Sequence, residues 1–304
     1  MRRFLQLSVL SLAVGAAGAC KPDEVVTTEN IPTAGVRFIN AVPDTNQMDM
    51  RFVDFVENNV QFRIGFRNNI VTTGPVPAST QVQYKPARAG QRHFRIFLND
   101  SVQTIAQTVL KDTTVNIVAD HNYTVLLYGF ARTGATPAMK LEFIDETVPD
   151  PGAQVALRVI NTTGSAIDVR HYVSRLNASG AETGTPPAAP TWANVAPQSI
   201  TSYVLVSPDS FRFNVQPAGG GAALFADARA LIGAPPSLSL TNTPCGGTGQ
   251  PKCDIAALPG TTIAGSAVTA LIFPRSVAGS KARQFTTPAI SFIWDRRPPR
   301  VPGT

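Results

Sequence analysis

Short segments in which apolar and polar residues alternate recur along most of the chain. In the segment 36–41, Val36 and Phe38 point to one face while Arg37 and Ile39 point to the other. The segment 48–52 alternates in the same way, and this period of two residues is typical of a β-strand. The residues Val42-Pro43-Asp44 between the two segments are typical of a turn. The pattern therefore predicts two strands joined by a turn.

Similar segments follow at intervals throughout the first half. The segment 123–128 is apolar on both faces, which predicts a strand in the interior of a sheet. Turn signals recur about every 8 to 12 residues, and the chain contains 23 glycines and 25 prolines, as expected for a sandwich of short strands. The further strands predicted in this half are 69–73, 80–84, 93–98, 103–110, 113–118, 123–129 and 139–144.

The second half of the chain repeats the first. The segment 157–161 is a degenerate copy of 36–40, and Asn161 follows Asn40 by 121 residues. Pro288, in the copy of the Thr-Pro-Ala segment, follows Pro137 by 151 residues, so the second half has about 30 additional residues. These additional residues include the stretch 179–190, rich in Gly, Pro and Ala, and the Cys245–Cys253 loop. We therefore predict a tandem duplication of one β-sandwich.

The length of 304 residues allows two domains, each with its own core. Two prolines in the predicted linker are expected to restrict the angle between the two domains. The predicted segments are a signal peptide (1–19), a flexible tether (20–33), a first sandwich (34–148), the linker (149–153), a second sandwich (154–297) and an extended tail (298–304).

The first predicted hairpin also suggests a family. Its sequence, Val36-Arg37-Phe38-Ile39-Asn40-Ala41-Val42-Pro43-Asp44 followed by Met48-Asp49-Met50, resembles the start of DUF4397 domains of the bacterial envelope. These domains typically begin with a strand such as V-R-V-x-N/H-A-S-P-D and continue with V-D-V. The second half resembles them less closely, because Thr162-Thr163-Gly164 replaces the Pro-Asp turn. The resemblance implies two tandem immunoglobulin-like antiparallel β-sandwiches and an envelope or extracellular location, without an established activity.

The start of the chain is typical of an export signal. Arg2 and Arg3 precede an apolar segment, 4–19, that is short for a membrane-spanning helix. The residues Ala17-Gly18-Ala19-Cys20 resemble the lipobox of bacterial lipoproteins, although that motif usually has Leu where Ala17 stands. We predict that Cys20 is lipidated. The resemblance also implies the outer membrane, since residue 21 is Lys and not Asp. The alternative is an ordinary secretory signal cleaved near Ala19.

The remaining cysteines are predicted to form a disulfide. Lipidation of Cys20 leaves Cys245 and Cys253, separated by seven residues that include three glycines and one proline. Such a turn-prone loop can bring two α-carbons within the ~4.4 to 6.8 Å that a disulfide needs. An oxidising compartment favours the bridge over the alternatives, which are two reduced thiols or a metal site.

Few residues suggest a metal or cofactor site. Asp44, Asn46 and Asp49 could supply oxygen ligands to calcium, but the glycine and distal glutamate of an EF-hand loop are absent, and we interpret them as turn formers. The three histidines have no metal-ligand spacing, so we expect structural or exposed roles for them. They are His93, His121 and His171. We predict no cofactor and no metal.

Catalytic motifs are also missing from the sequence. It contains no Gly-x-Ser-x-Gly elbow, and Gly219-Gly220-Gly221 lacks the following Lys-Ser/Thr of a phosphate loop. We interpret these glycines as a loop between strands, followed at most by one helical turn. Trp192 and Trp294 could form a sugar-stacking platform, but two tryptophans are more commonly core residues.

The charge pattern argues against nucleic acid as a partner. The formal charge is +6, but it is spread along the chain without a basic run interleaved with aromatic residues. The export signal, the duplicated sandwich and the missing catalytic motifs together favour a non-catalytic binding or structural lipoprotein. We expect a membrane anchor and an envelope glycan or protein as ligand. The alternative is an extracytoplasmic hydrolase that acts on envelope or extracellular polymers.

Overall fold

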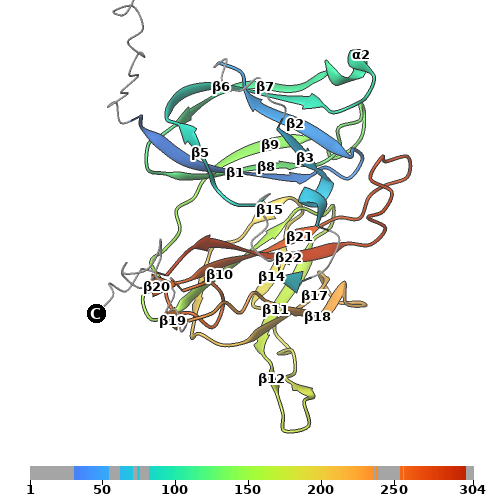
Figure 1. The fold of residues 1–304 in the computed structure, drawn as a ribbon. Helices are drawn as coiled ribbons and strands as arrows, with labels where there is room; N and C mark the ends of the chain where they lie inside the picture. Colours follow the sequence, from blue (N-terminus) through green and yellow to red (C-terminus); the bar gives the residue numbers. More distant parts are fainter. Residues whose placement is uncertain are drawn as a thin grey trace, which may run out of the picture. The chain divides into compact units, whose positions relative to one another are not determined.

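A computed structural model gives the structure of the chain (Figure 1). It describes residues 31–54, 62–70, 74–75, 82–235, 237–238, 254–255 and 257–298. Strands account for nearly all of their regular structure, so the predicted all-β sandwich fold is confirmed. The predicted leader, Cys20, most of the tether, Cys245, Cys253 and most of the tail lie outside these residues.

The first half forms two facing sheets of four strands each. We call the sheet with the order β5-β1-β8-β9 the junction sheet, because it packs against the second half of the chain. We call the sheet with the order β3-β2-β6-β7 the outer sheet. The bounds are β1 (Thr33–Ala41), β2 (Gln47–Phe52), β3 (Arg63–Gly65), β5 (Lys85–Arg88), β6 (Gly90–Leu98), β7 (Val109–Ile117), β8 (Asn122–Tyr128) and β9 (Lys140–Asp145).

The second half forms two sheets with the same order of equivalent strands. Its junction sheet has the order β15-β10-β21-β22-β4, and β16 also pairs with β10. Its outer sheet has the order β14-β11-β17-β18. The bounds are β10 (Val155–Asn161), β11 (Ile167–Val173), β14 (Trp192–Val195), β15 (Ser199–Ile200), β16 (Val204–Val206), β17 (Phe211–Pro217), β18 (Phe225–Arg229), β21 (Ala267–Phe273) and β22 (Ala289–Arg296).

The two junction sheets share an equivalent parallel pair, and the second sheet has a further short parallel pair of β22 with β4. β1 runs parallel to β8, and β10 runs parallel to β21. In both cases the second strand of the pair continues antiparallel into the last strand of its half, β9 or β22. The strand predicted at 123–128 therefore lies inside the sheet, between β1 and β9, as its apolar sequence indicated.

Alternation along the strands creates three apolar layers. Inside the first sandwich, Phe38, Met50 and Phe94 are buried between its two sheets. Inside the second, Val159 and Phe213 occupy the corresponding layer. A third layer, which includes Ile39, Leu126, Ile160, Leu271 and Phe273, belongs to the opposite faces of the junction sheets. The two sandwiches therefore share a buried apolar contact, and 33–304 form one compact unit.

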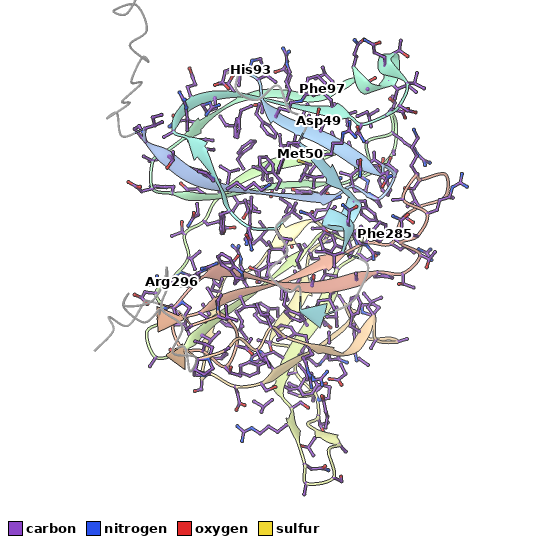
Figure 2. The ribbon with its side chains drawn as sticks, viewed as in Figure 1. Asp49, Met50, His93, Phe97, Phe285 and Arg296 are labelled. Carbon is purple, nitrogen blue, oxygen red and sulfur yellow. The ribbon has the colours of Figure 1, made fainter. Side chains whose placement is uncertain are left out.

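A segment of the first half contributes directly to the second. After β3 the chain enters the 3-10 helix η2 (Phe66–Asn69), and β4 (Gly74–Pro75) then pairs with β22 of the second junction sheet. Arg67 of η2 is buried and donates to the carbonyl oxygens of Pro274 and Thr287. Its guanidinium lies over the rings of Phe66 and Phe285, the latter labelled in Figure 2. This segment therefore connects the two halves through strand pairing, hydrogen bonds and cation–π contacts.

The structure corrects three of the predicted strands. The described residues 82–84 of the predicted strand 80–84 are not a strand, because β5 begins at Lys85, and Asn69 of the predicted strand 69–73 ends the 3-10 helix η2. The strand predicted at 103–110 is instead the short helix α2 (Gln103–Ala106), after which β7 begins at Val109. Asp100 starts this helical turn because its carboxylate accepts the backbone N–H of Val102. After the loop at Gly219–Gly221, the chain forms strand β18 and no helical turn, since pairing with β17 satisfies its backbone groups.

The insertion predicted at 179–190 includes part of a projecting hairpin. Strands β12 (Arg175–Leu176) and β13 (Glu182–Thr183) pair with each other and extend away from the second sandwich (Figure 1). The remaining pair is β19 (Ser237–Leu238) with β20 (Asp254–Ile255). None of the described helices is long and apolar enough to cross a membrane.

Candidate functional site

Four charged side chains meet between the two junction sheets. Arg37 comes from β1, Arg158 from β10, and the carboxylates of Glu146 and Asp295 come from the last strands of the two halves or the residue after them. The side chains of Arg37, Glu146 and Asp295 are fully buried, and that of Arg158 is 5% exposed. We call these four residues the junction cluster.

The contacts within the junction cluster are reciprocal. Arg37 donates to Glu146 at 3.2 Å and to Asp295 at 2.5 Å, and Arg158 donates to the same two oxygen atoms at 2.9 and 3.4 Å. Each arginine therefore bridges both carboxylates. Two positive and two negative charges cancel, which reduces the cost of holding them away from water.

The surroundings of the two arginines are also equivalent. Each Nε donates to a threonine hydroxyl at 2.7 Å, Thr124 on β8 or Thr269 on β21. Each guanidinium lies over the ring of a tyrosine that precedes the edge strand, at 4.7 Å for Tyr84 and 4.6 Å for Tyr203. The two halves thus place two similar arrangements face to face.

Electrostatic interactions within the cluster favour the charged forms of Asp295 and Arg158. Burial alone would raise the pKa of Asp295, but the charges of Arg158 and Arg37 and a hydrogen bond from Thr269 lower it below its ordinary value. Burial works against protonation of Arg158, yet Asp295 and the other partners raise its pKa. Burial also raises the pKa of Tyr203, whose hydroxyl donates to Asp295 at 3.0 Å. All of these groups keep their ordinary charge states at neutral pH.

A cavity of about 450 Å³ opens beside the junction cluster. Glu146 and Asp295 lie at its inner side, and the half-buried ring of Trp294 forms part of its wall. Arg296, labelled in Figure 2 at the end of β22, lies at the same cavity. The other lining residues are Tyr84, Asn122, Val148 and Arg297. This size is within the usual range of about 300 to 1,000 Å³ for small-molecule sites.

The acidic residues considered as calcium ligands have other roles. The buried carboxylate of Asp44 accepts the backbone N–H groups of Ala131 and Arg132 at 3.0 and 2.9 Å. Asp49 accepts the N–H of Phe62 and pairs with Arg51. Asp44 lies in a turn, as interpreted from the sequence, whereas Asp49 lies within β2 and is not a turn former. Over the described part of the chain, no group of three or more His, Cys, Asp or Glu side chains could hold a metal ion.

The three histidines lie at separate places in the fold. His93, labelled in Figure 2 on the outer sheet, contacts Asp112, and His121 contacts Asp145 at 2.9 Å. His171 lies among aromatic rings of the second sandwich and contacts Thr191 at 2.9 Å. Burial lowers the pKa of His171, so it is neutral at pH 7.

The two tryptophans have different environments. Trp192 is buried in the second core, where it stacks on Phe213, as expected for a core residue. Trp294 lies 6.2 Å from the ring of Tyr84, with the guanidinium of Arg297 over its face at 4.6 Å. The two rings therefore do not form a joint platform, and Trp294 lines the cavity beside the junction cluster.

Sequence reasoning missed the junction cluster, although one signal pointed to it. Arg37 and Arg158 occupy the same position of the repeated strand, three residues before Asn40 and Asn161. The face that carries Arg37 and Arg158 also carries Ile39 and Ile160, and isoleucine is among the residues most often buried. That signal could have shown that this face is buried against a carboxylate.

The repeated asparagines have a clear structural role. The side-chain oxygen of Asn40 accepts the N–H of Val42, and that of Asn161 accepts the N–H of Thr163, both at 3.0 Å. Their amide groups donate to carbonyl oxygens of neighbouring segments, such as Ile64 for Asn40. Each asparagine therefore fixes the turn that follows the first strand of its half.

Comparison with known proteins identifies the first part of this fold. The search of curated proteins found no match. A family described as a domain of unknown function, DUF4397, matches residues 34–172. The match contains the first sandwich from the second residue of β1 onward. It continues through β10, which repeats the motif of the first strand, and into β11. Residues 34–172 of this chain are therefore a DUF4397 domain.

Proposed function

We propose that this protein is a non-catalytic binding or structural lipoprotein of the bacterial envelope, built from two DUF4397-type sandwiches. The single observation that carries the proposal is the junction cluster. Its acidic and basic groups are buried and neutralise one another. A catalytic acid or base must instead exchange a proton with a substrate that it can reach.

The second DUF4397-type domain is proposed from the repeated architecture. β10, β21 and β22 reproduce the pairing of β1, β8 and β9, including the parallel pair. Arg158, Thr269, Asp295 and Tyr203 reproduce the residues around Arg37. This agreement of pairing and side-chain contacts supports a duplication of the same domain.

The contact between the two halves supports a structural or binding role. The shared apolar layer, the junction cluster and Arg67 connect the two sandwiches at three places. We infer that such a body presents its surfaces in a fixed arrangement at the end of a flexible tether. The proposed tether begins at a lipidated Cys20, which anchors the protein to the outer membrane.

The anchor is tested by producing the full chain and its Cys20→Ser variant in a bacterial host with two membranes. We expect the unchanged chain in the detergent phase, with a lipid-modified N-terminal peptide in mass spectra. The variant should be a soluble exported protein with an unchanged circular dichroism spectrum. An unmodified Cys20 in the mature chain would exclude the anchor.

The binding role is tested by incubating the purified Cys20→Ser chain with peptidoglycan, envelope polysaccharides and envelope proteins. We expect retention on one class of partner, with no new reducing ends or amines released from it. Release of such ends in proportion to protein concentration would instead support the hydrolase alternative.

A further inference from the structure

A groove runs along one edge of the junction sheets. The 450 Å³ cavity beside the junction cluster shares Tyr84 and Asn122 with a second hollow of about 300 Å³. The second hollow continues past the start of β1 and is lined by Gly35, Lys85 and His121 among others. Together the two hollows form an elongated site, and we call it the edge groove.

Gly35 creates the space for the polar residue in the middle of the edge groove. A Cβ atom at Gly35 would lie 2.2 Å from Oδ1 of Asn122, so a larger residue would displace the amide. Asn122 is exposed at the start of β8. Its amide can both donate and accept hydrogen bonds. The groove therefore has a positioned hydrogen-bonding group where its two hollows meet.

The aromatic wall of the groove favours a ligand with both apolar and polar surfaces. Tyr84 and Trp294 meet edge to face, with Trp294 only half-buried. The hydroxyl of Tyr84 is buried, so Tyr84 contributes its ring to the wall. A sugar ring has an apolar C–H face for an aromatic wall and hydroxyl groups for the exposed amide of Asn122.

The charges at the Arg297 end of the groove favour an anionic ligand, whereas the exposed carboxylate of Asp120 lines the second hollow. Glu146 and Asp295 are neutralised by the two arginines of the junction cluster. At the rim, Arg296 pairs with Asp150 at 3.0 Å, whereas Arg297 has no carboxylate partner in the described part of the chain. Trp294 holds the guanidinium of Arg297 beside the cavity. A guanidinium is well suited to a planar carboxylate, which it binds through two hydrogen bonds.

We propose that the edge groove binds an acidic saccharide, with sugar rings along Tyr84, Asn122 and Trp294 and a uronic-acid carboxylate on Arg297. This inference rests on the proposed binding function and names its ligand class. Contacts to the sugar hydroxyls orient the chain, and the charge of Arg297 selects the acidic sugar over a neutral one of the same shape.

The test titrates oligogalacturonate into the full chain carrying Cys20→Ser, with malto-oligosaccharide of equal length as the neutral probe. We expect saturable heat by calorimetry and a change in tryptophan fluorescence, both weakened by salt. The neutral probe should bind at least about tenfold more weakly, the ratio that corresponds to 1.4 kcal/mol.

Two variants locate the site on the surface. Arg297→Ala should weaken oligogalacturonate binding at least about tenfold and should leave malto-oligosaccharide binding unchanged. Asn122→Asp should also weaken binding of the acidic probe, because it places a negative charge in the groove. Arg283→Ala is the matched control, since Arg283 is an exposed arginine that lines neither hollow, and it should bind like the unchanged protein.

Three results would overturn the assignment. These are no binding of oligogalacturonate, equal binding of both probes, or equal loss in the Arg297→Ala and Arg283→Ala proteins. If the unchanged protein is retained on one of the polymers and the Arg297→Ala variant is retained equally well, the binding function stands. The edge groove is then not the site of that binding. If no polymer is retained but oligogalacturonate binds through Arg297, the groove assignment stands on its own.

Discussion

Arg37 and Arg158 are 121 positions apart, yet they share both of their carboxylate partners, Glu146 and Asp295. Each arginine comes from the first strand of its half, and each also donates to a threonine at 2.7 Å. The two halves therefore form an internal interface to which each contributes an arginine, a threonine and a carboxylate at equivalent positions. This relationship leads to the first two predictions.

Loss of Asp295 should strongly destabilise the protein. In Asp295→Ala, two buried arginines share only Glu146, and the hydroxyls of Thr269 and Tyr203 lose their acceptor. Breaking a buried ion pair by removal of one partner costs about 3 to 5 kcal/mol. Urea unfolding at pH 7 measures this loss. Asp150→Ala, which removes an exposed partner of Arg296, is the control and should cost less than about 1 kcal/mol. Equal losses in the two variants would contradict the role of the cluster.

The contribution of Asp295 should depend on pH in the acid range. The folded-state pKa of Asp295 is lowered, whereas an unfolded aspartate titrates near about 3.9. Its contribution is therefore present above about pH 4 and is lost as the pH falls through the folded-state pKa. We expect the difference in unfolding free energy between the protein and Asp295→Asn to be constant from about pH 7 to 5. Below about pH 4 the difference should shrink, and a difference that stays constant down to pH 2 would contradict this prediction.

Asn68 should be essential for the attachment of η2 to β1. Its side chain accepts the N–H of Asn40 at 3.0 Å and donates to the carbonyl of Phe38 at 2.6 Å. Asn68→Ala leaves both buried backbone groups without this partner, which should cost about 2 to 3 kcal/mol. Thermal or urea unfolding measures the loss, and Asn116→Ala, at an exposed position of β7, is the matched control.

A second substitution at the same position separates two causes. Asn68 has a φ of 51°, a conformation that glycine adopts more easily than alanine. Asn68→Gly removes the hydrogen bonds without backbone strain. If the hydrogen bonds dominate, Gly and Ala should destabilise by similar amounts. Full stability of the glycine variant would show that strain, and not hydrogen bonding, explains the effect of alanine.

Cys245 and Cys253 should form a disulfide in the exported protein. Closing so short a loop should stabilise the protein by about 2 to 3 kcal/mol in the chain-entropy model, mainly by restricting that loop. Proteolysis without reducing agent should give a linked peptide pair that separates on reduction. The Cys245→Ser/Cys253→Ser double variant should have a lower unfolding midpoint. Free thiols at both positions would exclude the bridge.

Local pattern predicted much of the fold because it acts over a few residues. Alternation in β1 and β2 and the apolar run of β8 predicted strands close to those found, and the copy at 157–161 predicted that the second half would repeat the first. The residues Val42-Pro43-Asp44 after the first strand predicted its turn. These properties depend on backbone geometry and on the choice of a buried face, which nearby residues determine.

The packing of one half on the other was decided only by the tertiary structure. Arg37 shares its face of β1 with Ile39, but the sequence does not reveal that this face meets β10 and its Arg158. Strand register also made Glu146 the counterpart of Asp295, because Thr124 lies opposite Ile144 and Thr269 lies opposite Ile293. Contacts between residues more than 100 positions apart depend on how whole sheets pack. The sequence determined the strands and their repetition, whereas sheet packing brought together the junction cluster and the edge groove.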